Sequence, residues 1–355
     1  MTSLKCGNLL SSFNAVPYEV PPLPEEMTSF GDDSPLQVVT RLNLDYEIPR
    51  DAWVPLVAHP DLADDPRLPR VFVDGALNSV EIAGSAQDSM GYARSIRAGQ
   101  LGVGAVSLDA PDQSLISCSC LLAITTMGYS EAQIVPLRAE LENHARALDL
   151  ITWEAMSDSY FKSAEEREVA VRDPATVRGR LRRRVTDVML EREQTLIRQI
   201  SLPIYADGRY VDHLPESNEQ FVIGVIKSMR RRYLDMPRLQ VLYGLAVGER
   251  TPAFETESQH SRVVSFYARI SSALAGATNG LVRVEIGKSH FENHQQQDWS
   301  LLDAMTAHMT RLKTKDTTYA RAAVTLEPIR VIEQRIQRLF HPAESVVMSA
   351  LNALR

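Results

Sequence analysis

Two aspartates each end an apolar stretch that has the composition of a buried strand. Asp74 closes VFVD and Asp207 closes PIYAD, and a glycine follows each, which lets the backbone turn away from the side chain. A lone Asp-Gly pair is more often a plain turn, because both residues favour turns. Two such pairs on apolar strands shift the balance modestly toward carboxylates held rigidly at strand ends. Hydrolysis of a phosphodiester needs at least two converging carboxylates on Mg²⁺ or Mn²⁺, and this pair could supply them.

A third carboxylate is available on a long predicted helix. Asp173-Pro174 is typical of a helix start, and the helical periodicity continues to roughly position 200. Within this helix, Asp187 and Glu191 are four residues apart and share a face, whereas Glu193 is rotated away. The alternative interpretation is that the helix alternates Arg and Glu for solubility. Spacing alone leaves both interpretations open.

The surrounding elements must position these acids, and their order predicts a mixed α/β fold. Residues 1–50 are rich in Pro, Ser and acidic residues, so we expect an irregular arm suited to partner docking, followed by one domain over 51–355. Strands are predicted on both sides of a turn at 75–78, over 99–108, as a hairpin through 207–210, and in QFVIGVIK and GLVRVEI. Helices are predicted over 130–150, 173–200, 298–313 and 328–355.

The composition limits the class of protein. Hydrophobic residues make up 44% and charged residues 23%, which is typical of a soluble globular chain, and no apolar run is long enough to cross a bilayer. The N-terminal residues lack the layout of a secretory signal, so we expect a cytoplasmic protein with no membrane association. Cys6, Cys118 and Cys120 are too few for a disulfide framework, and we expect them to be reduced.

The charge distribution bears on nucleic-acid binding. A net charge of −7 argues against a protein that coats nucleic acid indiscriminately, because such binding depends on neutralising phosphates. Two local basic stretches remain, VRGRLRRR at 177–184 and SMRRRYL with Arg230, Arg231 and Arg232. A charge run is usually a solvated face, and each stretch could equally be one.

Five motifs in order resemble the NurA-domain nucleases. They are VFVDG, a long helix with glutamate, YADGR, FVIGVIKSMRRRYL, and FYARI followed by GLVRVEI, and the resemblance covers roughly residues 68–340. It implies an α/β fold with a ribonuclease H-like core, related to the catalytic domain of Argonaute proteins, in which a mixed sheet is flanked by helices. It also implies a DNA nuclease that uses Mn²⁺ or Mg²⁺.

The resemblance assigns residues to this site. The family's first motif aspartate falls on Asp74, its central aspartate on Asp207, and its helical glutamate on Glu191, with Glu193 close enough in spacing to compete. Asp74, Glu191 and Asp207 are therefore the expected catalytic and metal-binding residues. Contacts to DNA are expected from Lys227, Arg230, Arg231, Arg232 and Arg262, and Glu285 occupies the acid of the RVEI strand.

The resemblance further implies partners. NurA-type nucleases work as homodimers docked on a hexameric HerA-type DNA translocase, in DNA end processing or antiphage defence. Two rival interpretations are a catalytically silent NurA-like scaffold of such an ATPase, and another ribonuclease H-like enzyme that acts on RNA. The chain departs from the family at its late histidine, because none of its candidates carries the matching motif: His290, His294, His308 and His341.

Overall fold

A computed structural model of the chain describes residues 4–18, 41–155, 161, 163–210, 220–227, 233–257, 261–272, 278–314 and 325–354. Its strands are β1 (Val16–Pro17), β2 (Arg41–Asn43), β3 (Leu56–Val57), β4 (Val71–Ser85), β5 (Arg94–Ser107), β6 (Ala110–Thr125), β7 (Leu148–Trp153), β8 (Ile204–Asp207), β9 (Val222–Ile226), β10 (Glu249–Arg250), β11 (Phe254–Glu257), β12 (Arg262–Arg269) and β13 (Leu281–Gly287). Its α-helices are α1 (Leu9–Ser12), α2 (Glu131–Glu142), α3 (Ala164–Ala170), α4 (Pro174–Arg198), α5 (Met236–Gly244), α6 (Lys288–Asn293), α7 (Trp299–Leu312), α8 (Glu327–Leu339) and α9 (Ala343–Ala353), and the 3-10 helices are η1 (Cys6–Asn8), η3 (Arg50–Ala52) and η4 (Pro60–Asp64).

The strands join into one mixed sheet, whose main path runs β2-β11-β12-β13-β9-β8-β4-β5-β6-β7. β4, β5 and β6 are long antiparallel neighbours. β8 lies between β4 and β9 and pairs in parallel with both. Parallel neighbours need a crossover connection, and α3 and α4 supply it in the chain leading to β8. The predicted mixed α/β architecture, in which helices flank a mixed sheet, is confirmed.

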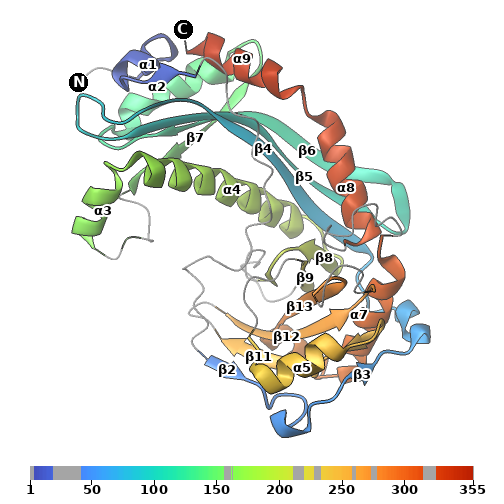
Figure 1. Cartoon of the computed structure of the whole chain (residues 1–355). Coiled ribbons are helices and arrows are strands. Elements are labelled where there is room, and N and C mark those ends of the chain that lie inside the picture. Colours follow the sequence, from blue (N-terminus) through green and yellow to red (C-terminus); the bar gives the residue numbers. More distant parts are fainter. Residues whose placement is uncertain are drawn as a thin grey trace.

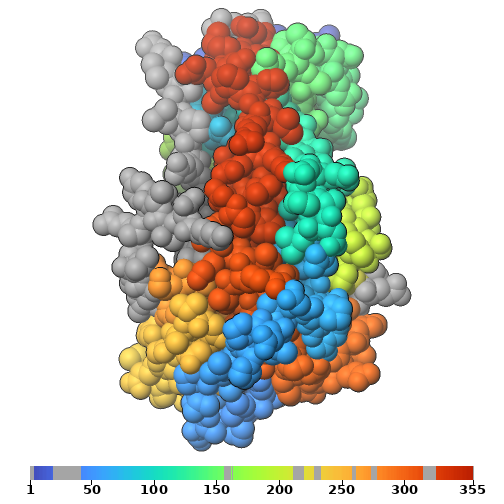
Figure 2. Space-filling view, turned by 90° about the vertical axis from the view of Figure 1, so that its right-hand side faces the viewer, coloured from blue at the N-terminus to red at the C-terminus, as the bar shows by residue number. Residues whose placement is uncertain are grey.

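Helices α4 and α8 cover opposite faces of the long strands (Figure 1). α4 begins at Asp173, whose carboxylate accepts hydrogen bonds from the backbone N–H groups of Ala175 and Thr176, as the Asp-Pro start predicts. α8 buries three isoleucines at helical spacing against the sheet: Ile329, Ile332 and Ile336. Figure 2 shows α8 and α9 running along one face, beside the hairpin of β5 and β6.

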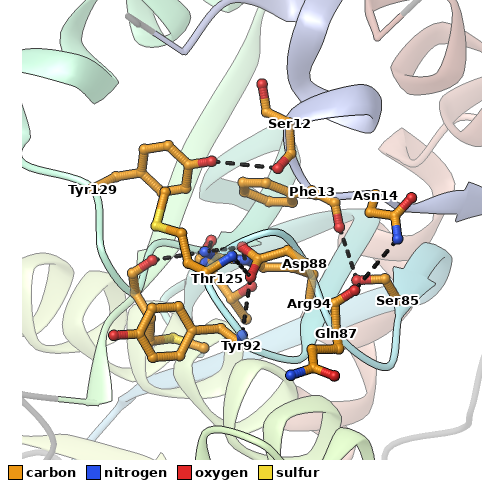
Figure 3. Close-up of polar contacts among 12 residues, drawn as sticks. Ser12, Phe13, Asn14, Ser85, Gln87, Asp88, Tyr92, Arg94, Thr125 and Tyr129 are labelled. Carbon is orange, nitrogen blue, oxygen red and sulfur yellow. Dashed lines mark hydrogen bonds and ion pairs between the residues drawn. The ribbon is translucent and has the colours of Figure 1, made fainter. Parts of the chain in front are cut away.

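The N-terminal segment packs at the end of the sheet where both termini lie (Figure 1). Leu4, Leu9 and Phe13 are fully buried there, so residues 4–18, which the composition placed in an irregular arm, contribute to the core. Beneath Phe13 the buried Arg94 guanidinium pairs with Asp88, Nε to Oδ2 at 2.7 Å (Figure 3). The same guanidinium lies over the ring of Phe13 at 4.7 Å. Residues 19–40 lie outside the described part of the chain.

Several predicted boundaries are wrong. β4 runs unbroken through 75–78, where a turn was expected, because β5 pairs with it along its whole length. Within the described residues, the hairpin predicted through 207–210 does not form, since β8 ends at Asp207 and pairs in parallel with both of its neighbours. The helix predicted over 130–150 ends at Glu142, and the helix predicted over 328–355 divides at Pro342 into α8 and α9. No helix in the described ranges is long and apolar enough to cross a membrane.

Candidate functional site

Strand register brings Asp74 and Asp207 together. β4 and β8 are parallel, with Val73 opposite Ala206, so the two aspartates are the next pair in register and lie on the same face. Asp207 in turn lies opposite Val225 of β9. Lys227 is two residues beyond Val225 and therefore reaches the same face. The three ionisable side chains meet because three neighbouring strands run in the same direction.

Lys227 binds the carboxylate of Asp207. Its Nζ lies 2.6 Å from Asp207 Oδ2 and donates a second hydrogen bond to Thr325 Oγ1 at 3.2 Å. Asp74 is only 8% exposed, and its Oδ1 accepts a hydrogen bond from the backbone N–H of Gly75 at 2.8 Å. The site is therefore a partly buried charge cluster whose cation is supplied by the chain itself.

Burial and neighbouring charges shift the pKa values of Asp74 and Lys227 in this cluster. Burial, and then the charge of Asp207, raise the pKa of Asp74 well above its usual range, although Lys227 and the Gly75 N–H act in the opposite direction. Burial lowers the pKa of Lys227, but the charges of Asp207 and Asp74 outweigh it, so this pKa is raised overall. Lys227 thus stays charged, and Asp74 is the group whose ionisation the cluster opposes.

Glu333 of α8 adds a further acidic charge, which sequence reasoning missed. Its charge raises the pKa of both Asp74 and Lys227. α8 faces the same side of the sheet as Asp74: Gly104 is opposite Asp74 in β5, and a Cβ built on it would lie 3.0 Å from Ile332 of α8. The sequence does place Glu333 next to the isoleucines that α8 buries, Ile332 and Ile336. It does not indicate which face of the sheet those isoleucines cover, so Glu333 could not be assigned to the site.

The two helical glutamates occupy different positions. Glu191 is 58% exposed at its side chain and pairs with Arg184 at 2.6 Å on the outside of α4, so the structure does not bring it to Asp74 and Asp207. Glu193 is only 3% exposed and packs against Gly75, where an added Cβ would collide with its Oε1. Successive strand residues face opposite sides, so Glu193 approaches β4 from the α4 side, whereas Asp74 faces α8.

The segment after Asp207 is held by a buried ion pair. Gly208 adopts φ 104°, a left-handed conformation that favours glycine, and this lets the chain leave β8. The Tyr210 N–H then donates to Glu285 Oε2 at 3.0 Å, and Arg283 Nε donates to Glu285 Oε1 at 3.0 Å. Arg283 and Glu285 share one strand face as predicted, but that face is buried. They support the turn and do not touch the aspartates' face of the sheet.

The residues expected to bind DNA do not all lie beside the two aspartates. Arg262, the first residue of β12, is exposed and pairs with Glu257 of the neighbouring β11 at 3.1 Å. Arg230, Arg231 and Arg232 lie outside the described residues. On α4, Arg183 and Arg184 both face acids of the same helix. The basic stretch of α4 is thus partly neutralised within the helix, as a solvated face would be.

Asp74 and Asp207 offer two of the ligands that a divalent cation requires. Within the ranges that the structure describes, no group of three or more His, Cys, Asp or Glu side chains is arranged to hold a metal ion. Mg²⁺ is commonly held by one or two carboxylates, with water and substrate phosphates filling its other positions. Asp74 and Asp207, in register and mutually repelling, fit that smaller requirement. Their oxygens are the donors that Mg²⁺ and Mn²⁺ prefer.

Comparison with known proteins gives one distant likeness of note. No protein-family model matches the sequence, and no curated protein matches it. Among solved structures, the chain is similar to the crystal structure of the NurA nuclease from Sulfolobus solfataricus, with 10% sequence identity and a TM-score of 0.39, over 80% of this chain and 81% of that one. The likeness is too distant to transfer an activity, so the functional argument rests on the residues of the site.

Proposed function

We propose that this protein is a metal-dependent nuclease that hydrolyses DNA phosphodiester bonds on a ribonuclease H-like sheet. The observation that carries the proposal is the register of Asp74 and Asp207 on neighbouring parallel strands, with Lys227 beside them. Few functions other than cation and phosphate chemistry account for two carboxylates and a lysine partly buried together on one face of three neighbouring parallel strands. Such a cluster is electrostatically costly, and perturbed ionisable groups of this kind concentrate at functional sites.

Each residue has a role that follows from its position. Asp74 and Asp207 would hold Mn²⁺ or Mg²⁺, which when bound activates water and offsets charge on the leaving oxygen. Lys227 would contact a phosphate, for which an ammonium group on a flexible stem is well suited. Glu285 keeps the turn after Asp207 in place through the Tyr210 N–H, so it is a positioning residue. Glu193 lies on the α4 face of β4, opposite to the face of Asp74, so it has no part in holding the ion.

Cleavage assays with aspartate variants test the proposal. Single-stranded DNA, duplex DNA and RNA are offered with Mn²⁺ to the wild type, Asp74→Asn and Asp207→Asn. The matched control is Asp109→Asn, which removes an exposed acid that pairs with Arg70 at 2.6 Å. We expect each site variant to lose about a hundredfold or more in rate, and the control to keep its rate. Wild-type cleavage by folded Asp74→Asn would contradict the proposal, and cleavage of RNA alone would assign the enzyme to RNA.

A second candidate function is a nuclease-like subunit that binds nucleic acid or an ATPase without cleaving. It is favoured by the ion pair between Lys227 and Asp207, which already neutralises one expected metal ligand. The same assays separate the two functions, because a silent subunit binds DNA and leaves it intact with every metal tested.

The partners implied by the sequence resemblance are also proposals. A HerA-type hexameric translocase and a second copy of this chain are expected to bind. Deleting the whole predicted N-terminal arm, residues 1–50, would test docking there, but it would remove the buried Leu4, Leu9 and Phe13 and so disturb the core. A deletion of residues 19–40 is therefore the sharper test of docking by the N-terminal region. Unchanged co-elution of that variant with the translocase would count against docking there.

A further inference from the structure

Lys227 is a cation that pairs with Asp207 and also acts on Asp74. Its Nζ is 2.6 Å from Asp207 Oδ2, and its charge also acts on the buried Asp74. The aspartates are in register on adjacent strands, so one ammonium group serves both. The chain has therefore placed a permanent positive charge where the proposed metal ion would also need to bind.

The ammonium group and a divalent cation compete for the same carboxylate oxygens. Mg²⁺ binds its oxygen ligands at about 2.0–2.1 Å and tolerates little distortion. An ammonium that stays 2.6 Å from Asp207 Oδ2 would repel such an ion strongly, because two positive charges would share one partly buried oxygen. A metal ion that takes Asp207 Oδ2 therefore requires the lysine to move.

The surroundings of Lys227 provide a place for it to move to. Its Nζ already donates to Thr325 Oγ1, immediately before α8, at 3.2 Å. Glu333, further along α8, also acts on the lysine's charge. A lysine stem is flexible and its ammonium group can rotate among partners, so Thr325 Oγ1 can hold Nζ when Asp207 does not, and the charge of Glu333 favours the charged form of the lysine.

We propose that a divalent cation bound by Asp74 and Asp207 displaces the Lys227 ammonium group from Asp207 toward Thr325. Lys227 is then an intramolecular counter-ion that keeps the empty site stable and limits its affinity for metal. Once displaced, the ammonium group is available to a phosphate of the nucleic acid. This inference rests on the proposed function, because it needs the metal site at the two aspartates.

Metal binding to Lys227→Met tests the inference without measuring cleavage. Mn²⁺ titrations followed by electron paramagnetic resonance give the affinity of the folded apoprotein. We expect Lys227→Met to bind Mn²⁺ about tenfold more tightly than the wild type, because a competing charge is gone. Mn²⁺ should also raise the unfolding midpoint of this variant more than that of the wild type. Lys227→Arg keeps the charge and should stay within about threefold of the wild-type affinity.

A matched control separates this effect from a general gain of negative charge. Lys288 pairs with Glu255 at 2.8 Å and is 18% exposed at its side chain, against 17% for Lys227. Lys288→Met should leave Mn²⁺ affinity unchanged. An equal gain in Lys288→Met would overturn the inference, as would equal or weaker binding by Lys227→Met while the wild type binds Mn²⁺. If neither the wild type nor Lys227→Met binds Mn²⁺, the metal site of the proposed function fails as well.

If Lys227→Met does not fold without metal, Lys227→Gln replaces it. A glutamine keeps a hydrogen-bond donor near Asp207 and removes the charge. The same gain in Mn²⁺ affinity is expected, and its absence would overturn the inference.

Discussion

At the scale of single residues, burying Asp74 beside the carboxylate of Asp207 costs the folded protein stability when Asp74 is ionised. Asp74 is buried beside a second carboxylate, and its pKa is raised by burial and by Asp207. The folded protein therefore holds the Asp74 proton to higher pH than the unfolded chain does. Ionising Asp74 costs the folded state free energy, so this group lowers stability as pH rises through its raised pKa.

Replacing Asp74 with asparagine should stabilise the metal-free protein. We expect Asp74→Asn to gain about 0.5–2 kcal/mol in free energy of unfolding at pH 7, the range typical of single stabilising substitutions. The gain should vanish at pH values below 3.8, the ordinary pKa of the group, where both folded and unfolded wild type are protonated. Urea denaturation at several pH values measures this. A loss of stability at pH 7 would contradict the assigned direction of the shift.

His308 should make the free energy of unfolding depend on pH in the opposite direction. It is buried in α7, its Nδ1 is 3.5 Å from Tyr205 Oη, and burial, with Arg311 and Arg70, lowers its pKa to about 4. The unfolded chain takes up a proton near pH 6.5 and the folded chain only near 4, so stability is lost as pH falls through this interval. The loss should reach up to about 3 kcal/mol. His308→Gln should flatten that part of a plot of unfolding free energy against pH.

At the scale of elements, the close approach of a helix to the sheet decides which helical acid is buried. α4 comes so near β4 at Gly75 that any side chain there would meet Glu193 and Met189. The glycine that seemed to serve a turn therefore serves close packing in the middle of a strand. The buried position of Glu193 is a consequence of this contact, and helical spacing alone gave it no preference over Glu191.

Two glycine substitutions should differ in sign. Gly75→Ala should destabilise the protein by about 1–3 kcal/mol, because its Cβ collides with Glu193 and overpacks the contact. Gly179→Ala, in the exposed part of α4 where nothing lies within 4 Å, should stabilise it by about 0.5–1 kcal/mol. Thermal unfolding of the two variants compares them directly. Equal effects would mean that α4 is not in contact with β4 at position 75.

At the scale of the whole molecule, buried ion pairs tie distant segments to the sheet. Arg94 and Asp88 are fully buried, and the Arg94 guanidinium contacts Phe13 of the N-terminal segment and the Met127 carbonyl (Figure 3). Arg250 similarly joins Glu47 to Asp303 of α7. Through these contacts, residues 4–18 and 41–52 become part of the fold that supports the central strands.

Breaking the Asp88 pair should destabilise the whole domain. Asp88→Ala leaves the Arg94 charge buried without its carboxylate, which typically costs about 3–5 kcal/mol. The double variant Asp88→Ala with Arg94→Met removes both charges and should recover part of that loss. Urea denaturation followed by circular dichroism measures both. A cost below about 1 kcal/mol for Asp88→Ala would indicate an exposed pair.

The sequence by itself determined the local features of this protein. Apolar runs ending in Asp-Gly marked β4 and β8, Asp173-Pro174 marked the start of α4, and alternation placed Arg283 and Glu285 on one face. These features depend on neighbouring residues, so a linear reading captures them. The order of the five motifs, through their resemblance to a known family, ranked Asp74 and Asp207 above the other acids as candidates.

Only the tertiary structure decided what lies beside those aspartates. The parallel pairing of β4, β8 and β9 sets the approach of Asp74, Asp207 and Lys227, and the packing of α8 on the same face adds Glu333. The packing of α4 on the other face separates the exposed Glu191 from the buried Glu193. These outcomes depend on register and on the choice of sheet face, which are set by contacts between segments far apart in the chain. Local periodicity carries no information about either.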